Sequence, residues 1–282
     1  MSLYPLNPGI VAGDLSLGFY NDIDQAGLLT DLELCLDAGA ASSYTSGQKW
    51  LDMSGNGYDF FLGSEGASAS TGDEPTFTGS AGGLSDSEYF VMDGGDFFSY
   101  DTGTLESWMT DMYKDNATWT VLMWTYGPAG GDGDGWFGVG FDAGGGGTPA
   151  VNYSNQGAGA IRQGLTIWRD SEPSVMFQAG GTVMANNAWH CHGISFDEPT
   201  GAGGGFLFLN GAYNQVSSSD TWNATISSAA TNNGAEFHIM ESNLVGQPWP
   251  NLTRIAGFMA WSTPLSFANM DAIYDRQKGR FA

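Results

Sequence analysis

The feature that most constrains this chain is a stretch near its start, residues 32–62, which reads LELCLDAGAASSYTSGQKWLDMSGNGYDFFL. It opens with an alternating run, in which one face carries Leu32, Leu34 and Leu36 and the other carries Glu33, Cys35 and Asp37. Such alternation is typical of a half-buried β-strand. Because Asp37 ends this strand, we expect its carboxylate to accept backbone N–H bonds from the next turn. A second turn, DMSGNGY, follows after Trp50.

Short apolar segments recur along the rest of the chain, and glycine turns separate them. The chain has 43 glycines among 282 residues and 14% charged residues, where typical domains have roughly 25%. This pattern predicts an all-β sandwich or barrel. We interpret the glycine-rich segments 130–135, 144–147 and 201–205 as loop tips, so that residues 32–282 form a single domain. The predicted later strands are Tyr58–Leu62, Tyr89–Met92, Trp119–Trp124, Trp136–Phe141, Leu165–Trp168, Ser174–Gln178, Trp189–Phe196, Phe206–Leu209, Phe237–Met240 and Ile255–Trp261.

One helix is predicted near the C-terminus, at Ser266–Lys278. Ser266 is a suitable N-cap, and Gly279 stands where a C-terminal capping glycine belongs. An apolar stripe at helical spacing consists of Phe267, Met270, Ile273 and Tyr274. We expect this stripe to pack on the edge of the sandwich. Residues 101–116 are predicted to form a short helix or a loop on the rim.

Residues 1–31 are predicted to be a separate N-terminal docking arm. Prolines and glycines interrupt any periodicity there, and the large apolar residues are scattered: Leu3, Tyr4, Leu6, Ile10, Val11, Phe19 and Tyr20. Burying each such side chain contributes roughly 1.5–3 kcal/mol, against an ordering cost of about 1–2 kcal/mol per backbone residue. The arm should therefore order only on a surface that accepts its apolar groups, and we predict that this surface is a neighbouring subunit or the shell of an assembly.

The charge and cysteine content exclude several classes of function. The formal net charge is −23, with eight lysines and arginines against 31 acidic residues, so the surface should repel nucleic acids and anionic membranes. No apolar run approaches the roughly 20 residues of a membrane span, and the first residues do not resemble a secretory signal. We interpret Cys35 and Cys191 as buried thiols of a protein made in the cytoplasm, with a bridge between them as the alternative.

Several short motifs occur in an order that resembles a known family. The segments LELCLDAG, LDMSGNGYDF and YFVMDGGDFF are followed by NAWH, FLFLNG and IAGFMAW before the final helix. Together they resemble concanavalin A-like, laminin-G-like jelly-roll domains over about 250 residues. The resemblance implies a jelly-roll sandwich of two antiparallel sheets with a concave face, and it implies no single activity.

Domains with this opening resemble those on virions of tailed bacteriophages, in decoration proteins and in head or tail fibres. We therefore expect a non-enzymatic virion structural protein, made in the host cytoplasm and displayed on the virion surface. Its partners would be the major capsid protein or another virion subunit, further copies of itself and host surface carbohydrate. The alternative is a free carbohydrate-binding or receptor-binding lectin module. A glycoside hydrolase is the third hypothesis.

Catalytic and metal-binding patterns are weak. Retaining glycosidases place two carboxylates about 5 Å apart, and the nearest pattern here runs through Asp31, Glu33 and Asp37 with Cys35 among them. We therefore predict no catalytic residues. His190 and His192 share one face of a strand, and we interpret both as structural. No cofactor is predicted, although Asp132 and Asp134 resemble part of a calcium loop.

Aromatic side chains are the candidates for carbohydrate binding, because exposed rings stack on sugars. Most of the ten tryptophans should fill the core. Trp136 lies beside the glycine-rich loop, Trp222 lies in another loop, and Trp249 stands between two prolines. We interpret Trp249 as the best exposed candidate.

Overall fold

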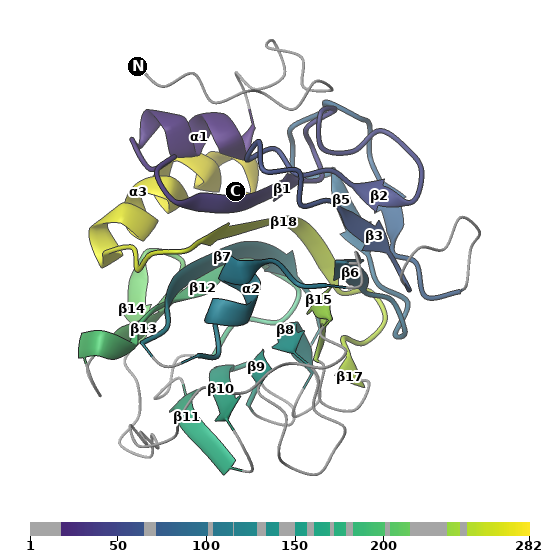
Figure 1. Cartoon of the computed structure of the whole chain (residues 1–282). Helices are drawn as coiled ribbons and strands as arrows, with labels where there is room; N and C mark the ends of the chain where they lie inside the picture. Colours follow the sequence, from purple (N-terminus) through teal and green to yellow (C-terminus); the bar gives the residue numbers. More distant parts are fainter. Residues whose placement is uncertain are drawn as a thin grey trace.

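The structure is a computed structural model, and it describes residues 18–64, 72–100, 104–114, 116–128, 134–140, 150–156, 161–169, 172–178, 183–200, 204–214, 236–242 and 247–282. Two antiparallel sheets pack face to face, as Figure 1 shows. This confirms the predicted all-β sandwich of two antiparallel sheets with a short C-terminal helix.

Within the described residues, the first sheet has eight strands, in the order β14-β13-β12-β7-β18-β5-β4, and β1 also pairs with β18. β5 pairs with the start of β18 and β1 with the remainder. Its strands are β1 (Leu32–Asp37), β4 (Thr76–Thr78), β5 (Tyr89–Val91), β7 (Thr118–Tyr126), β12 (Trp189–Asp197), β13 (Gly205–Leu209), β14 (Ala212–Asn214) and β18 (Arg254–Trp261).

The second sheet also has eight strands in the part of the chain that the structure describes, in the order β11-β10-β9-β8-β15-β6-β3-β2. They are β2 (Lys49–Trp50), β3 (Phe60–Leu62), β6 (Phe98–Tyr100), β8 (Gly135–Gly140), β9 (Ala150–Asn155), β10 (Gln163–Arg169), β11 (Glu172–Gln178) and β15 (Phe237–Ile239). A separate pair consists of β16 (Glu241–Ser242) and β17 (Gln247–Pro248). Each strand predicted from the sequence lies within or overlaps one of these strands.

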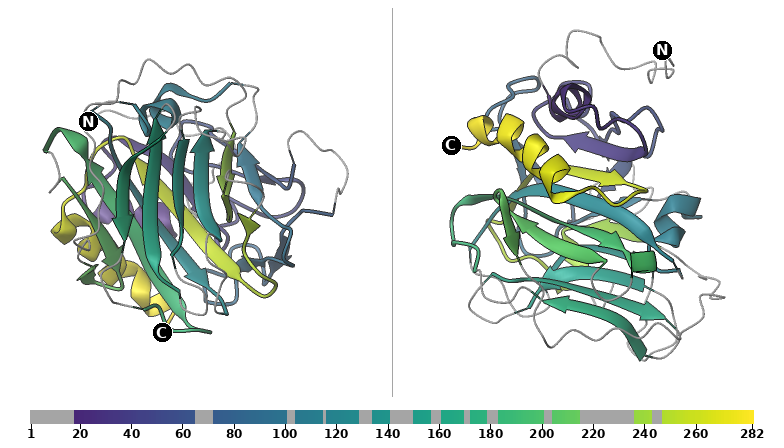
Figure 2. Two further views of the ribbon diagram at one scale, coloured as in Figure 1. Left: turned by 90° about the horizontal axis from the view of Figure 1, so that it is seen from below. Right: turned by 90° about the vertical axis from the view of Figure 1, so that its left-hand side faces the viewer.

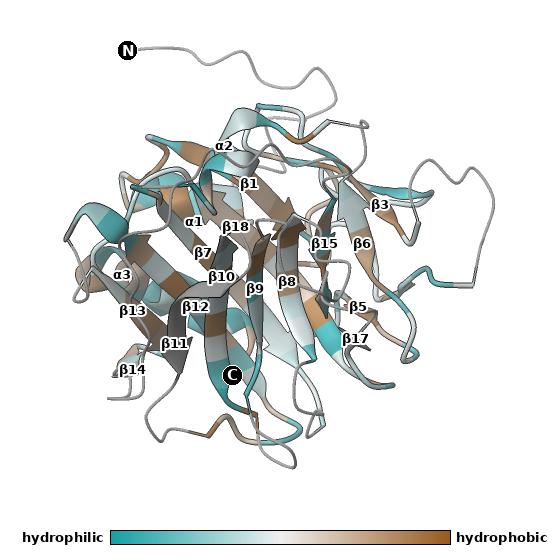
Figure 3. Cartoon of the chain, turned by 60° about the horizontal axis from the view of Figure 1, so that its bottom comes forward, coloured by the Kyte–Doolittle hydropathy of each residue, from teal (hydrophilic) through white to brown (hydrophobic). Residues whose placement is uncertain are grey.

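The core between the two sheets, which we call the inner core, is mainly aromatic and aliphatic. Alternate residues of β7 and β12 enter it, among them Trp119, Val121, Ile194 and Phe196. Hydrophobic residues occur along the strands of both sheets in Figure 3. Because side chains alternate across a strand, the other residues of β7 and β12 point to the opposite face of the first sheet.

That opposite face is covered by two helices, α1 (Phe19–Gln25) and α3 (Phe267–Gln277), as both Figure 1 and the right-hand view of Figure 2 show. They bury a second cluster, which we call the outer core, in which Phe19 and Ile23 of α1 join strand residues such as Trp124 and Met259. The short helices α2 (Ser107–Asp111), η1 (Glu198–Thr200) and η2 (Lys278–Arg280) complete the fold.

The prediction of a docking arm over residues 1–31 is wrong for residues 18–31. Phe19 is 1% exposed, and its backbone N–H donates to Asp37 Oδ2 at 3.0 Å. Tyr20 packs against the outer core. The physical reason is that the outer face of the first sheet is apolar and must be covered, which α1 does together with α3. Leu3, Tyr4, Leu6, Ile10 and Val11 lie outside the described residues, so their docking role stays a prediction.

The strand β1 departs from simple alternation because it contains a β-bulge. Its register with β18 shifts between Leu32 and Leu34, and Leu32 joins the outer core whereas Leu34 and Leu36 join the inner core. The prediction that these three leucines share one face is therefore wrong at Leu32. The opposite face is not exposed either, since Cys35 is fully buried beneath the helices. Cys35 and Cys191 are both buried free thiols, as predicted.

The C-terminal helix begins as predicted. The Ser266 Oγ accepts the backbone N–H of Asn269 at 3.2 Å, and Met270 and Ile273 are buried. The predicted capping role of Gly279 is wrong, because the chain continues through Gly279 as the helix η2. None of the described helices has the length and apolar composition that a membrane crossing requires.

Two buried aspartates hold the opening segment in place. Asp37 Oδ1 accepts the Gly39 N–H at 2.9 Å, as predicted, and also pairs with Arg280 Nη1 at 2.7 Å. Asp52 accepts backbone N–H groups from Cys35, Ser54, Gly57 and Tyr58. Gly57 has a φ of 81°, which L side chains rarely adopt. The SGNG turn therefore folds around one carboxylate.

Candidate functional site

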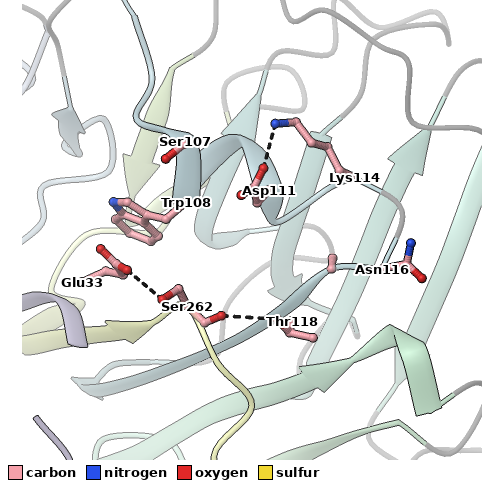
Figure 4. A pocket seen from close by; sticks show the side chains of 9 residues that line it. Glu33, Ser107, Trp108, Asp111, Lys114, Asn116, Thr118 and Ser262 are labelled. Carbon is pink, nitrogen blue, oxygen red and sulfur yellow. Dashed lines mark hydrogen bonds and ion pairs between the residues drawn. The ribbon is translucent and has the colours of Figure 1, made fainter. Parts of the chain in front are cut away.

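A pocket of about 490 Å³ lies where α2 faces the ends of β1, β7 and β18. We call it the Trp108 pocket, and Figure 4 shows most of its lining side chains. Its wall combines one aromatic ring with groups that form hydrogen bonds. The lining residues are Glu33, Ser107, Trp108, Asp111, Lys114, Asn116, Ala117, Thr118 and Ser262.

Glu33 reaches this pocket because of the bulge in β1. A bulged residue is taken out of the regular ladder, and bulges often redirect a side chain at the edge of a sheet. The Ser262 Oγ donates to Glu33 Oε1 at 2.7 Å, which fixes the carboxylate beside the pocket. Burial raises the pKa of Glu33, and the nearby charges of Asp31 and Asp52 raise it further, whereas the Ser262 hydrogen bond lowers it.

The helix α2 and the residues after it supply the opposite wall. Trp108 is 7% exposed, and its ring is supported from behind by Tyr58 and Phe237, with ring centroids 5.9 and 6.0 Å away. Asp111 Oδ1 accepts from Lys114 Nζ at 2.7 Å. The pocket therefore has an aromatic side held rigidly by packing and an opening lined by charged groups.

A second, smaller pocket of about 180 Å³ shares Glu33 with the first. We call it the Tyr20 pocket. Its walls come from α1, from the link to β1 and from the SGNG turn. The lining residues are Tyr20, Leu29, Asp31, Leu32, Glu33, Ser54 and Asn56.

The structure buries two of the three predicted tryptophans. Trp136 and Trp249 are 1% and 0% exposed, and their rings stack on each other at 3.7 Å between centroids. The interpretation of Trp249 as an exposed platform is wrong, because the ring turns inward onto Trp136. As the rings stand, neither can stack on a sugar. Trp222 lies outside the described residues.

The calcium candidates do not form a site in the part of the chain that the structure describes. Asp132 lies outside it, whereas Asp134 precedes β8 and its carbonyl accepts the N–H of Asn155 at 2.9 Å. No group of three metal-ligating side chains occurs among the described residues.

The three histidines all have partners from the protein itself. His190 lies between Asn210 and the Ala185 carbonyl. His192 is fully buried and contacts Thr125 Oγ1 at 2.9 Å and Tyr153 OH at 3.1 Å. Burial lowers the pKa of both.

His238 differs from the other two histidines, because Glu236 and Glu241 each place a carboxylate oxygen 3.0 Å from its ring. Burial lowers the pKa of His238, but the two carboxylates outweigh it and bring the pKa to about 9.

The carboxylates of the glycosidase-like pattern do not share one face. Asp37 is buried against Arg280 and Cys35 lies in the outer core. Asp31 and Glu33 both line the Tyr20 pocket, and Glu33 also lines the Trp108 pocket. The pocket residues of α2 were missed by the sequence analysis. The signal that could have found them is the spacing of Trp108, Asp111 and Lys114, which places an aromatic and a charged pair on one side of a helical turn.

Comparison with known proteins supports the fold. No family model and no curated protein matches the chain. Among solved structures, domain 4 of AbnA, a GH43 extracellular arabinanase from Geobacillus stearothermophilus solved with arabinotriose, is similar over 86% of this chain and 98% of that domain, with a TM-score of 0.55 and 13% identity. Trypanosoma rangeli sialidase in complex with sialic acid is similar over 88% of this chain, with a TM-score of 0.54 and 11% identity.

The chain spans 33% of the length of the sialidase and 98% of the arabinanase domain. At these identities the likeness concerns the fold alone. The chain is a β-sandwich of two antiparallel sheets. Both of these solved structures belong to glycosidases, and they provide no link to bacteriophage virions.

Proposed function

We propose that this chain is a carbohydrate-binding domain without catalytic activity, and that the Trp108 pocket is its glycan site. The observation that carries the proposal is the composition of the pocket wall, in which Trp108 faces a set of carboxylate, ammonium, amide and hydroxyl groups. Sugars have apolar C–H faces and a rim of hydroxyls, and small-molecule sites combine aromatic surface with a few oriented polar groups in this way. The fold it shares with the arabinotriose-bound domain supports the same class of ligand.

The charges of the pocket favour a neutral glycan. Glu33 and Asp111 contribute carboxylates and Lys114 contributes one ammonium group that is paired with Asp111. The whole chain carries a net charge of −23. An anionic sugar would therefore be repelled both at long range and at the pocket. Neutral hydroxyls can donate to the carboxylates and accept from the ammonium and amide groups.

A glycoside hydrolase is the second candidate, because Glu33 with its raised pKa and Asp111 line one pocket. Hydrolysis requires a second carboxylate as nucleophile or base. Asp111 is an exposed residue whose carboxylate is neutralised by Lys114 at 2.7 Å, which disfavours that role. We therefore keep binding without catalysis as the proposal.

Display on a bacteriophage virion is a wider proposal that rests on the sequence resemblance. It concerns where the domain is carried rather than what its pocket binds. Mass spectrometry of purified virions would test this proposal, and absence of the chain from the virions would contradict it.

The binding proposal is tested by affinity electrophoresis through gels containing arabinan, cellulose derivatives, xylan or mannan. The wild-type chain should be retarded by at least one neutral polysaccharide, and Trp108→Ala should abolish most of the retardation. The matched control is Tyr213→Ala, which removes an aromatic ring that is 54% exposed and lies outside the pocket. Equal retardation of wild type and Trp108→Ala, or a loss with Tyr213→Ala, would contradict the assignment.

A further inference from the structure

The Trp108 pocket and the Tyr20 pocket meet at one side chain, Glu33, which lines both. We infer that they are consecutive subsites of one groove, so that the domain binds a linear chain of neutral sugars across Glu33 rather than a single terminal sugar. This inference rests on the proposed function and adds the form of the ligand to it.

The first support is the position of Glu33 at the bulge of β1. In the described residues β1 pairs only with β18, so the bulge lies at an edge of the first sheet where no further strand covers it. The Ser262 Oγ donates to the Glu33 carboxylate at 2.7 Å, and the Ser262 N–H donates to the Asp31 carbonyl at 3.0 Å. The carboxylate is thus fixed in position, and Glu33 is a residue of the wall of both pockets.

The second support is that the far side of the bulge is also held rigidly. The Asn56 side-chain amide donates to the carbonyls of Leu32 and Glu33 at 3.1 and 3.0 Å, and the Ser54 Oγ donates to the Glu33 carbonyl at 2.9 Å. The SGNG turn therefore binds the bulged backbone directly. Polar groups positioned before binding lose little entropy when a ligand arrives.

The third support is the chemistry and size of the Tyr20 pocket. Tyr20 and the apolar residues Leu29 and Leu32 provide C–H and ring surface, and Asp31 and Glu33 provide polar edges. This is the same mixture that lines the Trp108 pocket. A volume of about 180 Å³ is below the roughly 300 Å³ at which pockets begin to hold an independent ligand. The smaller pocket is therefore suited to extend the larger one.

The test measures affinity as a function of chain length, by isothermal titration calorimetry with arabino-oligosaccharides and cello-oligosaccharides of one to five units. We expect at least a tenfold gain in affinity between the monosaccharide and the trisaccharide of the series that binds. Tyr20→Ala should remove most of that gain, and Tyr20→Phe, which keeps the ring, should restore it. Tyr213→Ala is the control, and thermal unfolding verifies that each variant is folded.

The outcomes separate the two proposals. If a monosaccharide binds as tightly as the trisaccharide, or if Tyr20→Ala leaves the gain intact, the two-subsite groove is wrong while glycan binding at Trp108 stands. If neither series binds, glycan binding of these two classes is wrong, and if binding survives Trp108→Ala unchanged, the assignment of the glycan site to the Trp108 pocket is wrong. In either case this inference fails with it.

Discussion

Replacing Phe19 by alanine should strongly destabilise the fold, although Phe19 comes from a segment that has no core of its own. Its ring is 1% exposed and lies against Gly257 of β18, where any added Cβ would collide with it. The Arg280 guanidinium lies 4.8 Å from the ring centroid. Truncation to alanine leaves a cavity that Gly257, which has no side chain, cannot fill. Buried Phe→Ala substitutions cost about 3–5 kcal/mol, and we expect the upper half of that range.

The measurement is urea unfolding followed by circular dichroism. With a slope of roughly 2–3 kcal/mol/M for a domain of this size, a loss of about 4–5 kcal/mol should lower the midpoint by about 1.3–2.5 M at an unchanged slope. Tyr213→Ala is the control and should change the free energy of unfolding by less than about 1 kcal/mol. A loss below about 1 kcal/mol for Phe19→Ala would show that α1 is not part of the folded domain, and an arm over the whole of residues 1–31 would then be the better description.

Three further predictions concern charged groups. Arg280→Met should cost about 3–5 kcal/mol, because it leaves the Asp37 carboxylate buried without its cation; a loss under about 1 kcal/mol in urea unfolding would refute this. Since the pKa of His238 is raised to about 9, its stabilising contribution of about 3 kcal/mol is fully present below pH 6.5 and is lost as the pH rises through 9. The fall in stability over this range should be smaller in His238→Gln than in the wild type. An equal fall in both proteins would contradict a stabilising role of protonated His238. The wild-type chain should release no reducing ends from neutral polysaccharides, and release that Glu33→Gln abolishes would establish a hydrolase.

Much of the fold could be predicted because strands and turns depend on local patterns. The alternation in Trp119–Trp124 and the glycines of SGNG depend on neighbours in the sequence, and the structure places β7 at Thr118–Tyr126. The bulge of β1 could not be predicted in this way, because it depends on pairing with β18, which lies far along the chain. Burial of the outer face of β1 depends on helices at the two ends of the described chain.

The candidate site could not be predicted for the same reason. Glu33 and Ser262 form one hydrogen bond across 229 residues of sequence. Trp249 is a residue whose exposure is predicted wrongly from the sequence. Its two flanking prolines favour an exposed loop, yet the position of its ring depends on Trp136, which no local pattern connects to it. Single aromatic residues therefore indicate a binding role only after their tertiary contacts are established.

The most direct test of glycan binding at the Trp108 pocket is a titration of indole N–H resonances in protein labelled with ¹⁵N-tryptophan. Trp108→Phe identifies the Trp108 resonance by its loss, and Trp136→Phe and Trp249→Phe identify those of the buried stack. On titration with arabinotriose and cellotriose, we expect one of the two sugars to shift the Trp108 resonance saturably while the resonances of the buried pair stay in place. A saturable shift of another tryptophan with no change at Trp108 would contradict the assignment of the site, and no shift with either sugar would contradict glycan binding of these two classes.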